Sequence, residues 1–561
     1  MAKITGKNAI FFVTSPRTPF KMIDEIKLLI KNYEGKKWNK ETQTAFAKDL
    51  SKADFFEGKI VSNLDFAARD RINRAPKALG FVNLDPVIKL TDAGKLFIES
   101  KRPHEIFTRQ LLKFQLPSPY HLDKSDKFKV KPYRELLKLI FELDGLSKDE
   151  ISIFVMQLTS IAKYEKIKNK IVAFRKKVKT IDRSVTSYKR IISQVFENEL
   201  KKLFKEDISS GNIATRESKD GSIAKFILTK KGNHRDYADA AIRYLRATTL
   251  ITFHPKTYKV YVPEEKISEV KFILSNVPQW PKHFRNIKEF KKYLFADEYP
   301  VLLNDNKDEI INSILGYNKK LSKESLLKKD TEKLKDIKDN FIAKKRDKNI
   351  ENQVNKLQAY DAYGDIIQTF DDIEKRVAVD PSLIMEWNTW RALTMLDDGN
   401  IIGNFRFDEN GMPLYAAPGN SPDITCKYKS FDIIVEVTIS TGQKQYEMEG
   451  EPVSRHLGKY KATSKKDVYC IFIAPVLNEA TLAHFFSLHK INVSYYGGMS
   501  KIIPMQLSDF KKMIEVANNS EKKPSADSIK KFLDYISELA LKTHNEKDWY
   551  QNISDYVLTW V

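Results

Sequence analysis

One short run places a charge inside a stretch that otherwise favours burial: Ile433-Ile434-Val435-Glu436-Val437. Its β-branched apolar residues predict a strand of a core sheet. A carboxylate in such a strand costs free energy unless it is paired or bound to a cation. The run therefore predicts both a buried sheet and a functional acid within it.

The residues before this run can pair with it as a β-hairpin. With Lys429-Ser430 at the tip, Tyr428 lies opposite Phe431, and counting outward places Asp423 opposite Glu436. A four-residue loop over residues 428–431 gives the same register. Opposed residues have Cβ atoms about 4.5 to 5.5 Å apart, so the two carboxylates repel each other unless a cation lies between them.

Mg²⁺ suits this pair of acids, because it prefers oxygen ligands and takes one or two carboxylates together with water and substrate phosphate. Val437 can add its backbone carbonyl as a further ligand. A metal here would neutralise a phosphate and lower the pKa of a bound water, which is the chemistry of a nuclease. Surface hairpins also carry acids, so a structural role for the pair stays open.

Three further polar residues are candidates for the same site. Glu386 lies in a predicted helix, and Glu449 and His456 lie in the polar segment that follows the strand. The two glutamates would complete the metal shell, and the histidine would orient water or phosphate. A surface ion pair or a capping role is the alternative for each. The predicted catalytic residues are thus Asp423, Glu436, Glu449, His456 and Glu386.

Apolar runs alternate with helical stretches towards the C-terminus, which predicts an α/β domain with a mixed central sheet over residues 379–561. A highly charged stretch with few glycines precedes this domain, and a helical linker is expected over residues 296–378. The expected strands cover residues 431–439, 468–474, 491–496 and 501–505, and the expected helices cover residues 452–461, 479–489, 508–517 and 526–542.

The first half of the chain contains the order helix, hairpin, helix twice. Thr91 is the expected N-cap of the helix after the first hairpin, and Pro263 is expected to start the helix after the second. This order is typical of winged helices, which bind DNA, although it also builds protein-contact modules. We expect two recognition subdomains, over residues 1–135 and 136–295.

Basic residues exceed acidic ones, 96 against 74, and the net charge of +22 favours a polyanion such as duplex DNA as partner. A lysine bias of the genome would produce the same excess. The lysine-rich segment 163–190 suits phosphate contacts or a solvated helix face. The residues predicted to contact DNA are Arg17, Arg69, Arg71, Arg74, Lys77, Arg235, Arg243 and Arg246.

Other classes of protein are disfavoured. The two cysteines, Cys426 and Cys470, form no CxxC or Cys/His pattern, which argues against a disulfide framework or a zinc site. No stretch approaches the ~18 apolar residues that a membrane span needs. We expect a soluble, cytoplasmic protein.

A series of blocks, in order through nearly the whole chain and weakest in the linker, resembles the AlwI and BstNBI family of type IIS restriction endonucleases, which includes naturally nicking members. The blocks are Ser15-Pro16-Arg17-Thr18-Pro19, Ala68-Arg69-Asp70-Arg71, Leu79-Gly80-Phe81-Val82, Arg243-Tyr244, Glu386-Trp387, Ala416-Ala417 with Gly419-Asn420, Pro422-Asp423, Glu436-Val437-Thr438, Glu449 with Glu451-Pro452-Val453, Arg455-His456 and Phe472-Ile473-Ala474-Pro475.

The resemblance implies a multidomain α+β fold: winged-helix-like recognition subdomains, a helical linker and a C-terminal α/β nuclease domain of the PD-(D/E)xK type. It implies Mg²⁺ ligation by Asp423, Glu436 and the Val437 carbonyl, with Glu386, Glu449 and His456 around them. The implied reaction cuts duplex DNA a few base pairs outside a short asymmetric site, with GAGTC favoured. The superfamily's usual lysine is Thr438 in this chain, so water activation lacks an assigned residue.

Three functions stay open at this point. The first is double-strand cutting by transient pairing of two nuclease domains in a homodimer. The second is a nicking enzyme, or a large subunit that needs a small nuclease subunit. The third is a winged-helix DNA-binding regulator in which the acidic hairpin is structural.

Overall fold

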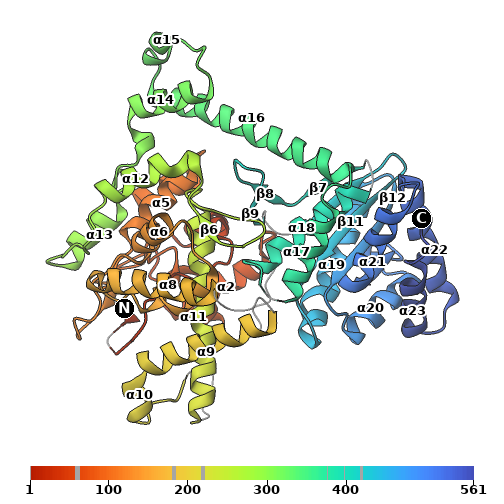
Figure 1. Cartoon of the computed structure of the whole chain (residues 1–561), viewed down its shortest axis with the longest axis horizontal. Coiled ribbons are helices and arrows are strands. Elements are labelled where there is room, and N and C mark those ends of the chain that lie inside the picture. The colour runs from red at the N-terminus through yellow and green to blue at the C-terminus, as the bar shows by residue number, and fades with distance from the viewer. Residues whose placement is uncertain are drawn as a thin grey trace. The chain divides into compact units, whose positions relative to one another are not determined.

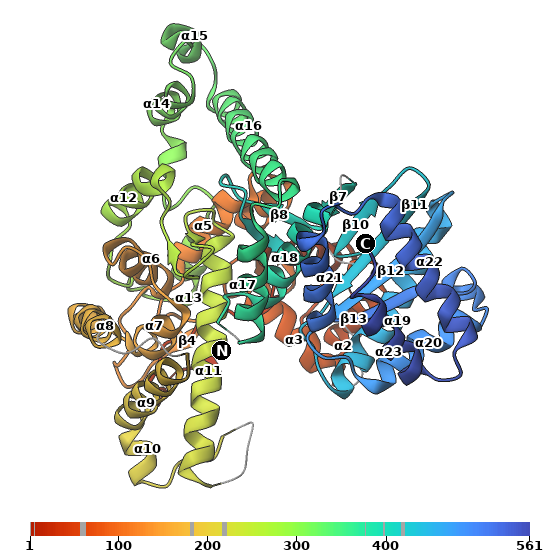
Figure 2. The ribbon, with the colours of Figure 1, turned by 45° about the vertical axis from the view of Figure 1, so that its right-hand side comes forward.

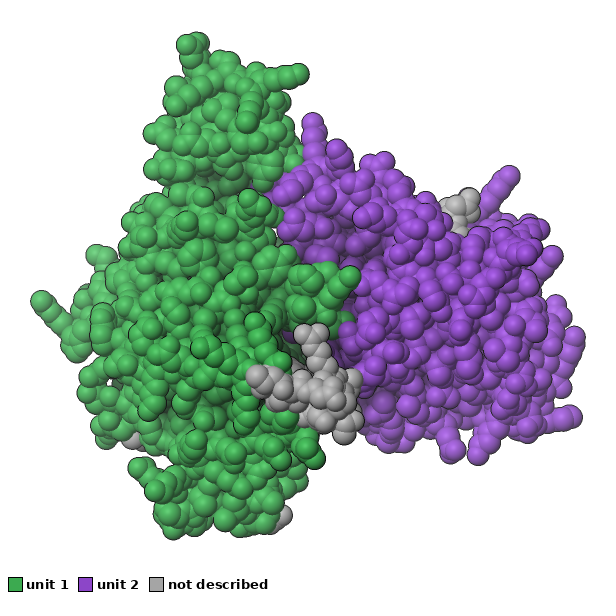
Figure 3. Space-filling view, viewed as in Figure 1, with its two compact units in different colours: residues 1–341 green, residues 342–561 purple. Residues whose placement is uncertain are grey.

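The computed structural model describes residues 2–4, 6–56, 63–179, 185–215, 221–375, 377–396, 399–416 and 421–561. The chain divides into two compact units, Met1–Phe341 and Ile342–Val561, which Figure 3 colours separately. Ala417, Gly419 and Asn420 of the family blocks lie outside the described residues, as does part of the lysine-rich segment. None of the described helices is long and apolar enough to cross a membrane.

Helices build most of unit 1 (residues 1–341), and its strands are short pairs (Figure 1). The elements up to residue 142 are β1 (Ala2–Lys3), η1 (Pro19–Lys21), α1 (Met22–Tyr33), α2 (Lys40–Lys52), α3 (Leu64–Arg74), β2 (Val82–Asn83), β3 (Lys89–Leu90), α4 (Asp92–Glu99), α5 (Pro103–Lys113), β4 (His121–Leu122) and α6 (Pro132–Glu142). Then follow α7 (Lys148–Ile153), η2 (Val155–Gln157), η3 (Ile161–Lys163), α8 (Tyr164–Lys179), α9 (Val185–Leu203), α10 (Lys205–Ser209), α11 (Ile223–Arg246), β5 (Thr252–Phe253), β6 (Val260–Tyr261), η4 (Glu264–Lys266), α12 (Ile267–Asn276), α13 (Ile287–Phe295), η5 (Leu303–Asp305), α14 (Lys307–Tyr317) and α15 (Lys323–Leu327).

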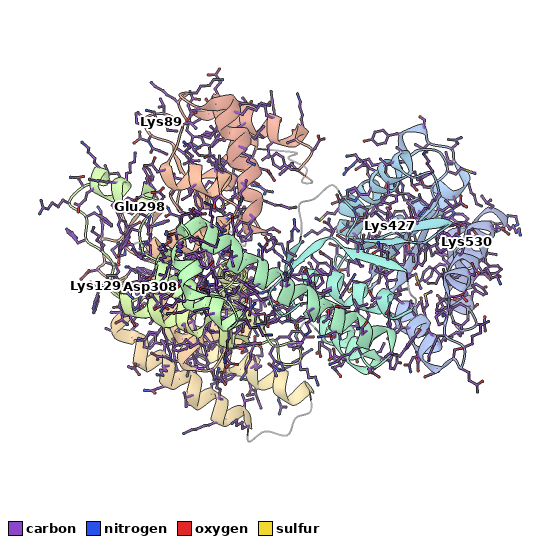
Figure 4. The ribbon with its side chains drawn as sticks, turned by 90° about the horizontal axis from the view of Figure 1, so that it is seen from above. Lys89, Lys129, Glu298, Asp308, Lys427 and Lys530 are labelled. Atoms are coloured by element: carbon purple, nitrogen blue, oxygen red, sulfur yellow. The ribbon has the colours of Figure 1, made fainter. Side chains whose placement is uncertain are left out.

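Both expected orders of helix, hairpin and helix are present in unit 1. The first consists of α3, the antiparallel pair β2–β3 and α4, and Figure 4 labels Lys89 on its second strand. Thr91 caps α4 as expected, because its Oγ1 accepts a hydrogen bond from the Gly94 amide at 2.9 Å. The second consists of α11, the antiparallel pair β5–β6 and α12, with the 3-10 turn η4 between Pro263 and α12.

One aromatic core joins the two halves of unit 1. The rings of Phe81 and Phe97 stack with centroids 4.1 Å apart, and the ring of Phe107 lies 5.7 Å from that of Tyr244 on α11. All four rings are buried. Large buried rings dominate the energetics of a core, so the two expected recognition subdomains are held together by shared packing.

The helix α16 (Thr331–Gln358) contains the division between the units, and its first turns are attached to unit 1. Arg102 is buried and pairs with the carboxylates of Glu332, Asp336 and Asp339 on this helix. Leu334 also packs into a buried apolar cluster with isoleucines of α14. The first turns of α16, which lie in the expected linker, are therefore packed within unit 1.

A five-stranded mixed sheet forms the centre of unit 2 (residues 342–561), in the order β13-β12-β11-β10-β7 (Figure 2). β11, β12 and β13 are parallel to one another, whereas β10 is antiparallel to β11 and to β7. The mixed sheet was expected. The elements are α17 (Tyr363–Glu374), α18 (Pro381–Leu396), β7 (Asn400–Gly403), β8 (Phe405–Phe407), β9 (Pro413–Ala416), β10 (Ile424–Lys427), β11 (Phe431–Val437), α19 (Gln443–Thr463), β12 (Asp467–Ala474), α20 (Glu479–Lys490), η6 (Ser494–Tyr496), β13 (Ile502–Gln506), α21 (Leu507–Asn519), α22 (Ala526–Lys542) and α23 (Glu546–Tyr556).

Helices α19 and α20 pack on one face of this sheet. Ile434 and Phe472 from the strands meet Leu457 of α19 and Phe485 of α20 in a buried apolar cluster. Alternate residues of a strand project to the same face. Glu436, two residues after Ile434, therefore projects towards the α19 side of the sheet.

Two expectations for unit 2 were wrong, and one was confirmed closely. Residues 491–496 do not form a strand, because the chain turns at Gly497 and Gly498, whose φ values are 72° and 95°. α19 begins at Gln443 rather than at Pro452, and the helix accommodates this proline in its interior, where one typically costs about 3 kcal/mol. The helix expected over residues 526–542 is α22, on which Figure 4 labels Lys530, although α23 follows it and α22 is therefore not the last helix.

Candidate functional site

The hairpin that carries the two acids has the register expected from the sequence. Ile424 lies opposite Val435 and Lys427 opposite Asp432, and the Tyr428 amide donates to the Phe431 carbonyl at 3.1 Å. Figure 4 labels Lys427, the last residue of β10. The paired residues end at Ile424 and Val435, and Asp423 and Glu436 continue the same count one step outward.

Asp423 is held across the hairpin at the carboxyl end of β11. Its Oδ2 accepts a hydrogen bond from the Val437 amide at 2.8 Å, and its backbone carbonyl accepts one from the Asn404 amide at 2.7 Å. Side chain and backbone are thus both anchored. The Asp423 carboxylate lies beside the residue that follows Glu436, as the counted register requires.

Glu436 is buried and contacts a histidine of the covering helix. His456 Nδ1 lies 2.8 Å from Glu436 Oε1, and both side chains are buried. The His456 ring nitrogen and the Glu436 carboxylate oxygen are therefore within hydrogen-bond distance of each other. The structure therefore brings together three predicted residues: Asp423, Glu436 and His456.

The helix α19 runs antiparallel to β11. Four residues after His456, the Tyr460 hydroxyl donates to Oδ2 of Asp432, which lies four residues before Glu436. Glu449 precedes His456 by seven residues, about two turns or 10 Å along the helix. Glu449 consequently lies on the same helix face as His456 and beyond the carboxyl end of β11.

Glu386 lies on α18, a helix that contacts β11. Its side chain is half-buried. The participation of Glu386 and Glu449 in one site with Asp423 stays a prediction, since among the described residues no group of three or more His, Cys, Asp or Glu is arranged to hold a metal ion.

The donor set nevertheless suits Mg²⁺. This ion keeps several waters and is commonly bound by one or two carboxylates plus substrate phosphate, and the carboxylates of Asp423 and Glu436 have that chemistry. The burial of Glu436 favours a cation as well, because a buried carboxylate is costly unless charge and hydrogen bonds compensate it. Val437 can contribute its carbonyl at the same strand end.

Cys470 lies on the neighbouring strand and was not expected to bear on the site. It pairs with Ile434 in the parallel register of β11 and β12. Burial raises the pKa of its thiol well above the ordinary value, and the negative charges of Glu436 and Asp423 raise that pKa further. The thiol is therefore neutral, and both acids act on it from close by.

Thr438 was singled out in the sequence because it stands where a nuclease of the PD-(D/E)xK type would usually have a lysine. Its amide donates to the Ile473 carbonyl at 3.0 Å, and its Oγ1 accepts from the Ser440 amide at 3.1 Å. The buried hydroxyl thus shapes the turn after β11. Thr438 supplies no positive charge for water activation.

Three of the predicted DNA contacts lie on α3. Arg69 and Arg74 have 45% and 44% of their side chains exposed and pair with Asp65 and Asp70 on the same helix. Arg71 is less exposed and pairs at 2.9 Å with the buried Glu25. These pairs hold the guanidinium groups at the surface in defined orientations.

The segment around Arg17 connects α3 with α11. Arg74 Nη1 donates to Thr14 Oγ1 at 3.1 Å, while Arg243 Nη1 donates to the Arg17 carbonyl at 2.6 Å. The Tyr244 hydroxyl donates to the Pro16 carbonyl at 3.2 Å. Basic residues predicted from three separate parts of the sequence are therefore close together in unit 1.

The remaining predicted contacts divide by burial. Arg235 is exposed and lies 3.7 Å from Asp149, whereas Lys77 is half-buried over the ring of Tyr120, and burial lowers its pKa. The prediction for Arg246 was wrong, because this residue is only 1% exposed and its guanidinium lies over the ring of Phe253. Helical spacing could not distinguish the buried face of α11 at this position from its exposed face.

Comparison with known proteins gives one family match. The family model described as AlwI restriction endonuclease matches residues 77–513. No curated protein matches the chain.

Two solved structures are similar over parts of the chain. One is the small subunit (R.BspD6I2) of the heterodimeric restriction endonuclease R.BspD6I, with 25% identity over 34% of this chain and 98% of that one and a TM-score of 0.30. The other is the BpuJ1 endonuclease binding domain in complex with pyrene- and phenanthrene-modified DNA, with 16% identity over 53% of this chain and 95% of that one and a TM-score of 0.29.

Proposed function

The chain belongs to the AlwI restriction endonuclease family and is a site-specific deoxyribonuclease, and we propose that it is a type IIS enzyme that uses Mg²⁺ to cut duplex DNA a few base pairs outside a short asymmetric site. The observation that carries this proposal is the arrangement at the end of β11. There the buried pair of Glu436 and His456 lies beside Asp423, which is anchored across the hairpin.

In this proposal Asp423 and Glu436 hold the metal, and Val437 adds its carbonyl. Mg²⁺ bound there would supply charge neutralisation at the scissile phosphate and a more acidic water. His456 keeps the Glu436 carboxylate oriented through Nδ1, in the way that partners of a ligating group usually fix its geometry. Glu449 and Glu386 are proposed to complete the surroundings from α19 and α18. A mixed sheet with this hairpin supports a nuclease domain of the PD-(D/E)xK type over residues 379–561.

Recognition is proposed to reside in unit 1. The two orders of helix, hairpin and helix support winged-helix-like subdomains over residues 1–135 and 136–295, followed by a helical linker over residues 296–378. Arg69, Arg71 and Arg74 on α3, together with Arg17 and Arg243, are proposed to contact DNA. GAGTC is the proposed recognition sequence.

Cutting both strands requires a second nuclease site. Within the described residues, the pair of Asp423 and Glu436 defines one proposed metal centre, and one centre acts on one phosphodiester bond at a time. We therefore propose that the second strand is cut by the nuclease domain of a second copy in a transient homodimer. A small nuclease subunit is the alternative partner.

A supercoiled plasmid that contains one GAGTC site tests the proposal. In Mg²⁺, linear product with ends mapped outside the site supports double-strand cutting, and nicked circle supports a nicking enzyme or a large subunit. Asp423→Ala should abolish cutting and keep specific DNA binding, since binding is assigned to unit 1. The matched control is Asp467→Ala, which changes an exposed acid at the start of β12. Full cleavage by the Asp423→Ala enzyme would contradict the metal site.

A further inference from the structure

A glutamine at the start of α19 makes an unusual set of contacts. Gln445 has 0% of its surface exposed. Its Nε2 donates to the Ser440 carbonyl at 2.8 Å and to the Val476 carbonyl at 2.9 Å, and its Oε1 accepts from the Asn478 amide at 2.8 Å. Both faces of the side-chain amide are therefore used, and every partner is a backbone group.

The partners belong to two loops that leave neighbouring strands. Ser440 lies in the loop after β11, which ends at Val437. Val476 and Asn478 lie in the loop between β12 and α20. β11 and β12 are parallel, so both loops start at the same edge of the sheet. That edge carries Glu436 and the anchored Asp423.

The same helix also presents the histidine of the site. Gln445 precedes Glu449 by four residues and His456 by eleven, and both spacings return to nearly the same face of an α-helix. A displacement of the first turn of α19 would therefore move Glu449 and would disturb the contact of His456 with Glu436. The Gln445 amide connects three elements of the site: the β11 loop, the β12 loop and α19.

We propose that Gln445 is a positioning residue of the metal centre, which keeps the Val437 carbonyl and the α19 side chains in place for a divalent cation. This proposal rests on the metal site assigned under the proposed function. Gln445 itself is not a ligand in it, because its amide oxygen and nitrogen are both engaged by backbone groups.

The chemistry of the site requires a side-chain amide at this position. The buried side chain meets two carbonyl acceptors and one amide donor, and glutamine offers two donors and an acceptor in one plane. Glutamate has a similar shape but offers acceptors only, so it would face two carbonyl oxygens. Methionine and leucine offer no hydrogen bonds and would leave three partly buried backbone groups without their side-chain partner.

The test is metal binding by the full-length protein in the absence of DNA, measured with Mn²⁺ by electron paramagnetic resonance, together with plasmid cleavage over a Mg²⁺ titration. We expect Gln445→Leu and Gln445→Glu to weaken Mn²⁺ binding by 10- to 100-fold, the usual effect of removing an outer partner of a metal site. The Mg²⁺ concentration for half-maximal cleavage should rise correspondingly, and the KM for DNA should stay unchanged. Gln443→Leu is the matched control, because Gln443 is exposed on the same first turn.

The outcomes separate this inference from the proposed function. If wild type and Asp423→Ala bind Mn²⁺ equally, the metal site itself is wrong. If Asp423→Ala loses Mn²⁺ while both Gln445 variants bind it as wild type does, Gln445 has no positioning role. Gln445→Met retains the length of the side chain and serves if Gln445→Leu does not fold. Loss of the fold in both would also overturn the proposal, since it would assign Gln445 to overall stability.

Discussion

Glu25 of unit 1 should make the stability of the protein depend on pH in a defined direction. Its side chain is only 2% exposed and pairs with the more exposed Arg71 at 2.9 Å. Burial raises the pKa of Glu25 to about 7, from an ordinary 4.5, although the positive charge of Arg71 acts in the opposite direction. Folding therefore disfavours the ionised form of this carboxyl.

The sign of the effect follows from the raised pKa. The contribution of Glu25 to stability is fully present below pH 4.5, where it is protonated in both states, and is lost as pH rises through about 7. One pKa unit corresponds to about 1.4 kcal/mol, so the loss amounts to about 3 kcal/mol between these limits. A loss of this size is a large part of the stability of a typical domain.

The assay is thermal unfolding of the full chain at a series of pH values from 4.5 to 8. Glu25→Gln should remove the decline that wild type shows over this range, so the difference in unfolding free energy between the two proteins should change by about 3 kcal/mol. Glu41→Gln changes an exposed glutamate on α2 and should follow wild type. A constant difference between wild type and Glu25→Gln over the whole range would refute the reasoning.

Three further predictions concern an exposed arginine, a buried arginine and a buried glycine. Arg74→Ala should weaken DNA binding if Arg74 contacts a phosphate, and the slope of the logarithm of the binding constant against the logarithm of the salt concentration should fall in magnitude by about 1. Arg246→Ala should instead lower the unfolding temperature, because that guanidinium packs over Phe253 in the core. DNA binding measured by fluorescence anisotropy at several salt concentrations distinguishes the two variants. An unchanged slope for Arg74→Ala would show that Arg74 does not contact a phosphate. Gly458→Ala should destabilise unit 2 by about 1 to 3 kcal/mol in a denaturation experiment, since the added Cβ would lie 2.8 Å from the Tyr496 Cα. The control is Gly364→Ala in α17, whose added Cβ meets nothing within 4 Å and should be neutral or stabilising.

The pairing of the hairpin could be predicted from the sequence because a strand has a fixed period of two. Once the tip of the hairpin is placed at Lys429-Ser430, the partner of every residue further along the two strands is fixed. The structure has the register counted in this way. Thr91 as an N-cap and the limits of α22 were equally accessible, since capping and helical periodicity are local properties.

Other features depended on contacts between residues far apart in the chain. The spacing in α11 marked Arg246 as polar, but only packing against Phe253 placed its guanidinium in the core. The strand expected over residues 491–496 had suitable residues, yet the turn at Gly497 and Gly498 prevented it. Gln445 carried no local signal, because its three partners are backbone groups that only the folded loops bring together.

The sequence by itself determined the register of the hairpin formed by β10 and β11, because strand geometry is periodic, and it marked Glu436 as a charge in an apolar run that needs compensation. Only the tertiary structure decided which side chain reaches Glu436. The distance of 2.8 Å to His456 exists because α19 packs antiparallel on β11, and the placement of a helix on a sheet is set by long-range apolar contacts that no local pattern encodes.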